Sequence, residues 1–169
     1  MLIAIISDTH GNSATFKKFA DWARQNNIQE IIHCGDIGFA DFIKEASQLL
    51  PNAKIHLVID EVKNEEKDLN KLVEDGAISN INFCGETGDI ELGGKKIAFT
   101  HKRSDAKKLA LTNKFDLVFF GHSHQPSEEK IGDCRLINPG ELAGQVYRPS
   151  FAVYDTNTDK LTLKILDLL

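Results

Sequence analysis

Histidine and aspartate residues stand in four short groups along the chain, and each group follows an apolar segment typical of a β-strand. The groups are Asp8-Thr9-His10, Gly35-Asp36, Thr100-His101 and Gly121-His122-Ser123-His124. Imidazole nitrogens and carboxylate oxygens together form a donor set that suits Mn, Fe, Ni or Zn better than Mg or Ca. Each group alone is weak evidence, because Gly-Asp is an ordinary turn dipeptide and a single histidine is more often a hydrogen-bonded polar group than a ligand.

Taken together, the four groups are stronger evidence for a common site, because each lies at the end of an expected strand. Four of the six histidines and two aspartates belong to them. Ligands of open α/β sheets bind at the carboxyl ends of the strands, so we expect these side chains to converge there. Asp36, if shared between two such sites, would hold two metal ions roughly 3.5–4 Å apart.

The first half of the chain alternates strand and helix patterns. Residues 2–7, 30–34 and 54–59 are short apolar runs, typical of strands buried on both faces. Between them we expect one helix capped by Asn12 or Ser13 and a second over residues 39–50. Their apolar faces are Phe16, Phe19, Ala20 and Ala23 in the first and Phe42, Ile43, Ala46, Leu49 and Leu50 in the second. This βαβαβ order predicts parallel strands with right-handed crossovers.

The second half is dominated by hairpin patterns. Gly93-Gly94 separates strands expected over 89–92 and 95–100, and Gly132-Asp133 separates 128–131 from 134–137. A third hairpin pairs 151–154 with 161–166, and between the first two hairpins we expect a helix at 104–111 and a strand at 115–120. The whole predicts two packed sheets with helices outside.

Composition narrows the class of protein. The 169 residues suit one domain over residues 1–169, and 41% hydrophobic with 27% charged residues is ordinary for a soluble globular protein. The net charge of −5 argues against a general nucleic-acid or anionic-membrane binder. We see no targeting or membrane-spanning segment. The spacing of Cys34, Cys84 and Cys134 predicts reduced thiols and a cytoplasmic location.

The order of the motifs resembles that of the calcineurin-like metallophosphoesterases. The resemblance covers nearly the whole chain, and in length and layout it is to the small single-domain bacterial and archaeal phosphodiesterases. It is carried by Asp8-x-His10, Gly35-Asp36, His101 after a strand, Gly121-His122-x-His124 and Asn138-Pro139-Gly140. It implies an α/β (α+β) fold, a four-layer αββα sandwich of two mixed β-sheets flanked by helices, with a dinuclear metal centre.

The resemblance also assigns ligands. One metal would take Asp8, His10, Asp36 and His124; the second would take Asp36, His101, His122 and one group from the loop after the third strand. Asp36 and His122 would be the catalytic residues, acting with a metal-bridging hydroxide. The implied cofactors are two divalent transition-metal ions, with Mn favoured and Ni, Fe or Zn as alternatives.

The chain departs from the family in the loop after the third strand. Where the family has Gly-Asn, this sequence has Asp60-Glu61. Glu61 could ligate in place of Asn, Asp60 could ligate instead, or the second metal site could be damaged. A ligating Glu61 would raise metal affinity but weaken the attraction for an anionic phosphate.

Other residues are candidates for binding the substrate, which we expect to be a small phosphodiester. Lys102 and Arg103 could hold a phosphate oxygen or be solvated charges before a helix; the same two interpretations apply to Arg148, and Asn12 is a further candidate for substrate binding. The phosphomonoesterases have a proton-donating His just after the Asn position, where this chain has Val62. Because a diester with a good leaving group needs that donor least, a phosphodiesterase is favoured.

A protein-interaction scaffold is the alternative function. The small subunit of the retromer coat is similar in fold and length, and it departs from the family at the same loop. A scaffold does not need the complete set of histidines that this chain keeps, whereas Glu61 favours the scaffold. A homo-oligomer would be unsurprising for the family.

Overall fold

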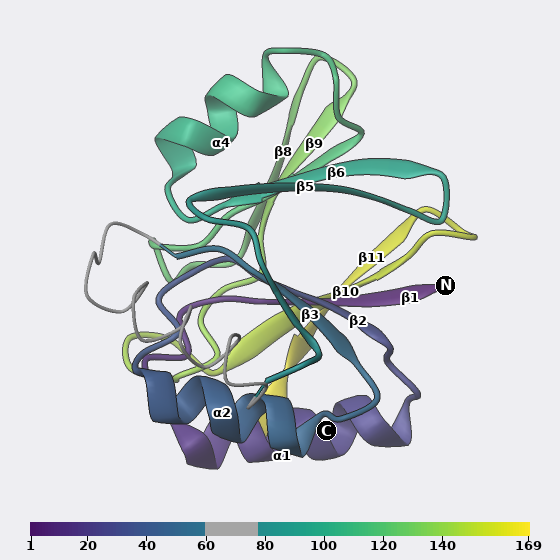
Figure 1. The fold of residues 1–169 in the computed structure, drawn as a ribbon. Helices are drawn as coiled ribbons and strands as arrows, with labels where there is room; N and C mark the ends of the chain where they lie inside the picture. Colours follow the sequence, from purple (N-terminus) through teal and green to yellow (C-terminus); the bar gives the residue numbers. More distant parts are fainter. Residues whose placement is uncertain (60–77) are drawn as a thin grey trace.

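Two β-sheets lie face to face, and helices cover the outer face of each (Figure 1). This computed structural model describes residues 1–59 and 78–169. The order of layers is helices α1 (Ser13–Gln25) and α2 (Ala40–Leu49), the first sheet, the second sheet and helix α4 (Arg103–Ala110). The four-layer sandwich of two mixed sheets is therefore confirmed.

The first sheet has six strands in the order β11-β10-β1-β2-β3-β4. Their bounds are β1 Leu2–Ile6, β2 Glu30–His33, β3 Lys54–Leu57, β4 Ile81–Phe83, β10 Ser150–Asp155 and β11 Lys160–Ile165. Strands β1 to β4 pair in parallel, as the βαβαβ pattern predicts, and β10 joins β1 antiparallel. The sequence pattern missed β4, which has three residues, all half-buried.

The second sheet has five strands in the order β5-β6-β7-β9-β8. Their bounds are β5 Thr87–Leu92, β6 Lys95–Thr100, β7 Leu117–Phe119, β8 Ser127–Ile131 and β9 Cys134–Asn138. The expected hairpins β5–β6 and β8–β9 are present, and β7 is parallel to both β6 and β9. The carboxyl ends of β6 and β7 therefore lie at one edge of this sheet.

Helices α1 and α2 bury most of the apolar side chains that the sequence predicted for them. The helices of the described residues are α1 Ser13–Gln25, α2 Ala40–Leu49, α4 Arg103–Ala110 and the short 3₁₀ helix η1 Leu166–Leu168. The Asn12 side chain caps α1 by accepting from the Thr15 N–H. In α2, Leu49 is only partly buried, and Ser47 is buried beside the apolar residues.

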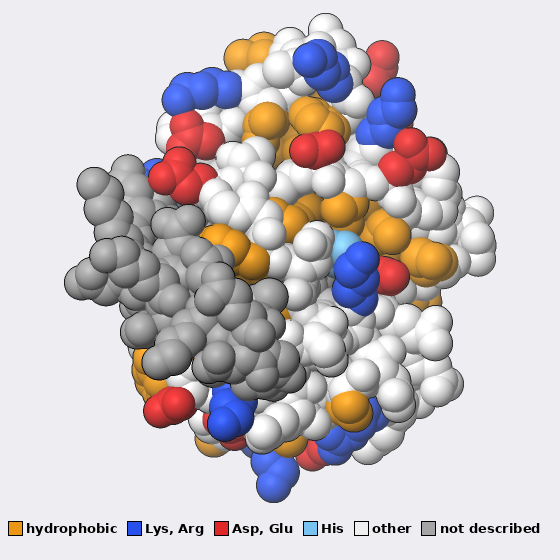
Figure 2. All heavy atoms as spheres, in the orientation of Figure 1, with side chains coloured by type: hydrophobic (Ala, Val, Ile, Leu, Met, Phe, Trp, Pro, Cys, Tyr) orange, Lys and Arg blue, Asp and Glu red, His pale blue; other side chains and the backbone are white. Residues whose placement is uncertain are grey.

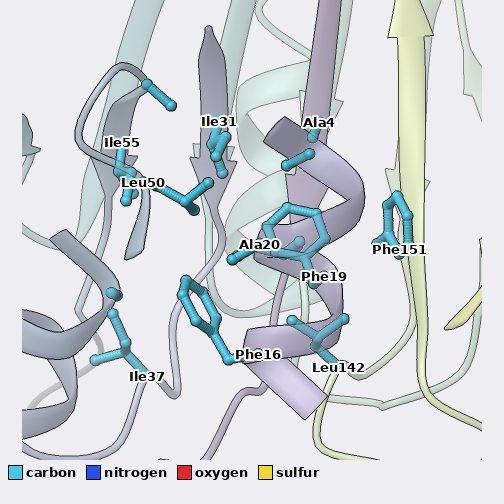
Figure 3. Close-up of a cluster of buried hydrophobic side chains, with 14 of the residues drawn as sticks. Ala4, Phe16, Phe19, Ala20, Ile31, Ile37, Leu50, Ile55, Leu142 and Phe151 are labelled. Carbon is cyan, nitrogen blue, oxygen red and sulfur yellow. The ribbon is translucent and has the colours of Figure 1, made fainter. Parts of the chain in front are cut away.

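Three apolar clusters correspond to the three interfaces between layers. In Figure 3, Phe16 and Phe19 of α1 face side chains of the first sheet, Phe151 among them. A second cluster, which contains Ile5, Phe99 and Phe119, fills the space between the sheets. A third packs α4 on the second sheet. These layers fix the relative positions of the strand ends.

The surface is mixed in charge. Figure 2 shows acidic and basic side chains interspersed over one face, as in an ordinary solvated surface. Cys34, Cys84 and Cys134 form no disulfide, in line with the expected reduced thiols. Within residues 1–59 and 78–169, the helices are too short or too polar to cross a membrane.

His33, at the end of β2, is a buried polar group that supports the loops around it. The Gly35 N–H donates to its Nδ1 at 3.2 Å, so the neutral ring carries its proton on Nε2. That Nε2–H donates to Thr9 Oγ1 at 2.9 Å, and the Thr9 hydroxyl donates to the Ile37 carbonyl at 2.8 Å. Burial lowers the pKa of His33 to about 3. The ring is therefore neutral and structural.

We predict that His33 makes the metal-free protein sensitive to acid. Below pH 6.5 the unfolded chain binds a proton on His33 that the folded chain excludes until about pH 3. The free energy of unfolding should therefore fall as the pH drops through this window, by about 1.4 kcal/mol per pH unit from this group. Urea unfolding in the presence of a chelator at several pH values should give a steeper dependence for the wild type than for His33→Gln. Parallel curves for the two proteins would contradict the prediction.

Candidate metal centre

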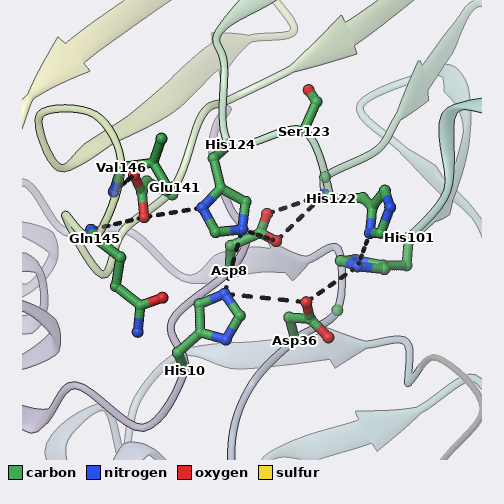
Figure 4. A network of polar contacts seen from close by, with 12 residues as sticks. Asp8, His10, Asp36, His101, His122, Ser123, His124, Glu141, Gln145 and Val146 are labelled. Carbon is green, nitrogen blue, oxygen red and sulfur yellow. Dashed lines mark hydrogen bonds and ion pairs between the residues drawn. The ribbon is translucent and has the colours of Figure 1, made fainter.

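Six side chains from the ends of four strands meet where the two sheets approach each other. Figure 4 shows Asp8 and His10 after β1, Asp36 after β2, His101 after β6, and His122 and His124 after β7. Their donor atoms form two groups, each within 4.8 Å: Asp8, His10 and His124, and Asp36, His101 and His122. The residues that the sequence analysis singled out are therefore brought together.

The first cluster combines one buried carboxylate with two half-buried imidazoles. His124 Nε2 lies 3.3 Å from Asp8 Oδ1 and 3.3 Å from His10 Nε2. The His122 backbone N–H donates to both carboxylate oxygens of Asp8 at 3.2 Å. The second sheet thus orients a carboxylate that belongs to the first sheet.

The second cluster lies beside the first, with Asp36 between them. Asp36 Oδ2 is 3.3 Å from His101 Nε2 and 4.0 Å from His10 Nε2. His122 Nδ1 is 3.3 Å from His101 Nε2. Asp36 Oδ2 therefore lies within 4.0 Å of imidazole nitrogens of both clusters.

Two glycines allow the sheets to approach this closely. A Cβ atom on Gly121 would lie 1.9 Å from Ser7 Oγ and 2.6 Å from Asp8 Oδ2. A Cβ atom on Gly35 would lie 2.6 Å from His101 Nδ1. Real Cβ atoms do not tolerate such distances, so glycine is required here for close packing of backbone against side chain.

The backbone at the strand ends is strained. In the two described segments, eight non-glycine residues have a positive φ, and five of them are candidate ligands. These five are Asp8, His10, Asp36, His122 and His124. A left-handed conformation costs a non-glycine residue of order 1 kcal/mol or more, and such strain clusters at functional sites. Here the left-handed conformation directs the side chains of the short loops toward the same site.

The hydrogen bonds of His101 show that its surroundings suit a cation. Its Nδ1 is 2.8 Å from the Cys34 carbonyl, which can only accept, so Nδ1 carries a proton. In the neutral ring, Nε2 then presents a lone pair to the Asp36 carboxylate oxygen, which is also an acceptor. Either a second proton or a metal ion must separate the two groups. The donor set of imidazole and carboxylate in both clusters fits a divalent transition metal.

The pKa values of His101, Asp36 and Asp8 reflect the opposing effects of burial and of neighbouring charged groups. Burial lowers the pKa of His101, but the neighbouring Asp36 carboxylate outweighs it, and the net pKa lies above the usual value. The hydrogen bond from His101 lowers the pKa of Asp36. Burial raises the pKa of Asp8. A metal ion that binds here must displace protons, so its affinity should depend on pH.

The candidate substrate-binding residues lie in different surroundings. The Asn12 side chain is engaged, because its Nδ2 donates to the Ala143 carbonyl at 2.9 Å while its Oδ1 caps α1. Arg103 pairs with Glu129 of β8 at 2.6 Å, at the surface. Lys102 is the N-cap residue of α4, and Arg148 is exposed. Asp60, Glu61 and Val62 lie outside the described residues.

Glu141 was missed by the sequence analysis. It is fully buried, and its carboxylate Oε2 lies 3.1 Å from His124 Nδ1 (Figure 4). A signal was available, because this acid directly follows Asn138-Pro139-Gly140 and is the one charged residue within residues 136–143, which are mostly apolar. A charged residue in such a run is unusual unless it has a partner.

Comparison with known proteins places this arrangement in a family. A model of the calcineurin-like phosphoesterase superfamily domain matches residues 1–159. A phosphodiesterase of Methanocaldococcus jannaschii is 30% identical over 159 residues, which cover 92% of this chain and 93% of the relative. A probable metallophosphoesterase of Bacillus subtilis, YsnB, is 25% identical and covers 99% of this chain and 91% of the relative.

Comparison with solved structures also finds proteins of similar fold. An archaeal phosphodiesterase superimposes with a TM-score of 0.86 at 27% identity, and the match covers 98% of this chain and 99% of that chain. Vps29 of Entamoeba histolytica, solved with Zn²⁺, gives a TM-score of 0.65 at 20% identity, covering 96% and 90%. At that identity the second similarity shows a shared fold alone.

We predict that Mn²⁺ stabilises the protein and that Asp36 is needed for the effect. At a free concentration of 100 times the dissociation constant, the ion should add about 2.7 kcal/mol to the free energy of unfolding, which raises the melting temperature by roughly 5 to 10 °C. The shift should be largely lost in Asp36→Ala and smaller at about pH 6 than at about pH 8, because the ligand imidazoles must be unprotonated.

The matched control is Asp133→Ala, which removes an exposed carboxylate from the β8–β9 turn, at the opposite end of β9 from the site. Differential scanning fluorimetry with and without Mn²⁺ measures the shift. Equal shifts for Asp36→Ala and Asp133→Ala would mean that the ion binds elsewhere.

Proposed function

The chain belongs to the calcineurin-like phosphoesterase superfamily, and we propose that it is a metal-dependent phosphodiesterase with a dinuclear centre. One observation carries the proposal. Six imidazole and carboxylate side chains from two sheets converge in two adjacent clusters, with Asp36 between them. Support also comes from the name of the archaeal relative, which is a phosphodiesterase.

The proposed centre holds two divalent ions. Asp8, His10, Asp36 and His124 would bind one, and Asp36, His101, His122 and Glu61 would bind the other. Mn²⁺ is the favoured metal, with Ni, Fe or Zn as alternatives. Bound ions of this kind supply a hydroxide nucleophile near neutral pH and stabilise negative charge on phosphoryl oxygens.

The contribution of the chain is to hold the donors in place before a substrate arrives. The Cys34 carbonyl fixes the ring of His101, and the His122 N–H fixes the Asp8 carboxylate. Asp8 and His101 are almost fully buried, whereas His122 is exposed and Asp36 is partly exposed. The site is therefore closed toward the sheets and open toward solvent, where a small phosphodiester can enter.

The proposed preference for phosphodiesters over phosphomonoesters rests in part on one position in the sequence. Val62 stands where phosphomonoesterases of the family carry a His that protonates the leaving group. Without this donor, the chain should favour esters whose leaving group departs without protonation.

We predict that purified protein with Mn²⁺ or Ni²⁺ hydrolyses bis(4-nitrophenyl) phosphate faster than 4-nitrophenyl phosphate. Both esters release nitrophenolate, which departs without a proton, so the missing donor does not distinguish them. The diester is favoured because it carries one negative charge rather than two beside the proposed ligand Glu61. Asp36→Ala should lower kcat/KM by roughly 100-fold or more, because removing even a residue behind a ligand costs about 10- to 100-fold. Absorbance of nitrophenolate provides the measurement, and His122→Ala should behave like Asp36→Ala.

The variant Glu61→Asn separates this function from the alternative, a binding scaffold with an impaired site. Turnover by the wild type shows that Glu61 is compatible with catalysis. If the wild type is inactive and Glu61→Asn is active, the chain has kept its site and lost its catalysis. A scaffold should also keep its partner when the metal is chelated.

A further inference from the structure

Within the described residues, four polar neighbours face the two oxygens of the buried Glu141 carboxylate. The residue follows β9 and is inaccessible to solvent. Its Oε1 accepts from the backbone N–H groups of Val146, at 2.6 Å, and Tyr147. Its Oε2 accepts from the Gln145 N–H at 2.8 Å and lies 3.1 Å from His124 Nδ1. Every neighbour is therefore either a fixed donor or an imidazole nitrogen that can become one.

The hydrogen bonds around Glu141 suit an ionised carboxylate. Three backbone N–H groups, from Gln145, Val146 and Tyr147, donate to its two oxygens, and hydrogen bonds of this kind favour the charged form. An ionised carboxylate can only accept hydrogen bonds. His124 must then donate from Nδ1, which leaves the Nε2 lone pair of the neutral ring directed at Asp8 and His10.

The same carboxylate holds the loop that borders the site. Three consecutive N–H groups, from Gln145 to Tyr147, donate to it. The chain just before this loop is fastened to the first sheet, because the Leu142 and Ala143 N–H groups donate to the Ser7 and Asp8 carbonyls. Glu141 thus connects one cluster to a loop whose side chains are exposed.

We propose that Glu141 is a positioning residue, which fixes His124 with Nε2 available for a metal ion and ties that orientation to the loop formed by Gln145, Val146 and Tyr147. The inference rests on the proposed metal centre, although it does not require that the centre hydrolyse an ester. Residues behind metal-ligating histidines fix the ring and its tautomer in this way, and their loss costs about 10- to 100-fold in metal affinity.

Glutamine cannot replace Glu141 in this role, although it has nearly the same shape. A Gln side chain has one accepting oxygen and one donating NH₂ group. If its NH₂ takes the position of Oε2, it opposes the Gln145 N–H and forces the His124 proton onto Nε2. If its NH₂ takes the position of Oε1, it opposes the N–H groups of Val146 and Tyr147. In either orientation, Gln loses the hydrogen bond to His124 Nδ1–H or the hydrogen bonds to the loop N–H groups.

The matched control is Glu30→Gln. Glu30 forms the same kind of pair, with its Oε2 2.8 Å from Nε2 of the buried His56. This pair lies at the start of β2 and in β3, away from the strand ends that carry the clusters. A general loss of stability from breaking a carboxylate–imidazole pair will appear in both variants, whereas an effect on the metal centre will appear only in Glu141→Gln.

Two measurements test the proposal. Nitrogen-15 NMR of the metal-free protein at about pH 8.5 should show His124 as the Nδ1–H tautomer in the wild type and in Glu30→Gln, with a shift toward Nε2–H or a mixture in Glu141→Gln. Titration calorimetry with Mn²⁺ should show one of two dissociation constants raised by about 10- to 100-fold in Glu141→Gln and unchanged in Glu30→Gln. Amide exchange at Gln145–Tyr147 should accelerate in Glu141→Gln alone.

A double-mutant cycle with His124→Ala identifies the route of the effect. If Glu141 acts through His124, Glu141→Gln should have no further effect on Mn²⁺ affinity in the His124→Ala background. An undiminished effect there, or a wild-type His124 that carries its proton on Nε2, would overturn the proposal. Should Glu141→Gln fail to fold, Glu141→Asp, which keeps the charge but is too short to reach both partners, replaces it in the cycle.

These results are separable from the proposed function. A protein that binds Mn²⁺ and shows the Nδ1–H tautomer but turns over no ester would refute the phosphodiesterase and leave the role of Glu141 intact. An active enzyme in which Glu141→Gln changes neither the His124 tautomer, nor the Mn²⁺ affinity, nor the amide exchange of the loop would do the reverse.

Discussion

The close approach of two separate β-sheets at their strand ends is the constraint on which the site depends. Asp8, His10 and Asp36 follow strands of the first sheet, and the three remaining histidines follow strands of the second. Neither sheet alone brings together a complete cluster. Gly121, packed on Ser7 and Asp8, and Gly35, packed on His101, set the distance between the two edges. Because interiors are close-packed, the apolar cluster between the sheets transmits any change of spacing directly to the ligand atoms.

Strain and burial at these ends are balanced by hydrogen bonds between the loops, some of them made by residues outside the two clusters. His33 and Thr9 tie the loop after β1 to the loop after β2. The N–H groups of Asp8 and His10 donate to the Gly35 and Asp36 carbonyls, so the left-handed residues of one loop are held by the other. Such strain persists only where the surroundings fix it from several sides. The described loops are therefore held in position by hydrogen bonds that do not depend on an ion.

The sequence predicts most of this fold because its signals are local. Apolar runs, helix caps and Gly-containing turns each lie within a dozen residues and specify strands, helices and hairpins directly. The missed strand β4 is short and half-buried, so its pattern is weak, and it is added to the sheet edge by pairing with β3. The positions of the ligands at strand ends were also accessible, since the strands end at Asp or His.

What the sequence could not provide are contacts between distant segments. The Arg103–Glu129 ion pair and the hydrogen bond from Asn12 to the Ala143 carbonyl join residues far apart in the chain. The local sequence around one partner does not predict the other. Glu141 belongs to the same class, because its importance depends on His124, which is 17 residues away. A list of motif residues identifies the donors to a metal, but the residues that orient those donors are fixed by tertiary packing.

These orienting contacts make the two clusters unequal. The His101 ring donates from Nδ1 to a neutral backbone carbonyl, whereas the His124 ring faces the ionised carboxylate of Glu141. A carboxylate behind an imidazole increases the electron density on the nitrogen that faces the metal. His122, by contrast, presents Nδ1 to its cluster and is exposed. The cluster of Asp8, His10 and His124 is thus the more strongly donating and the more deeply supported of the two.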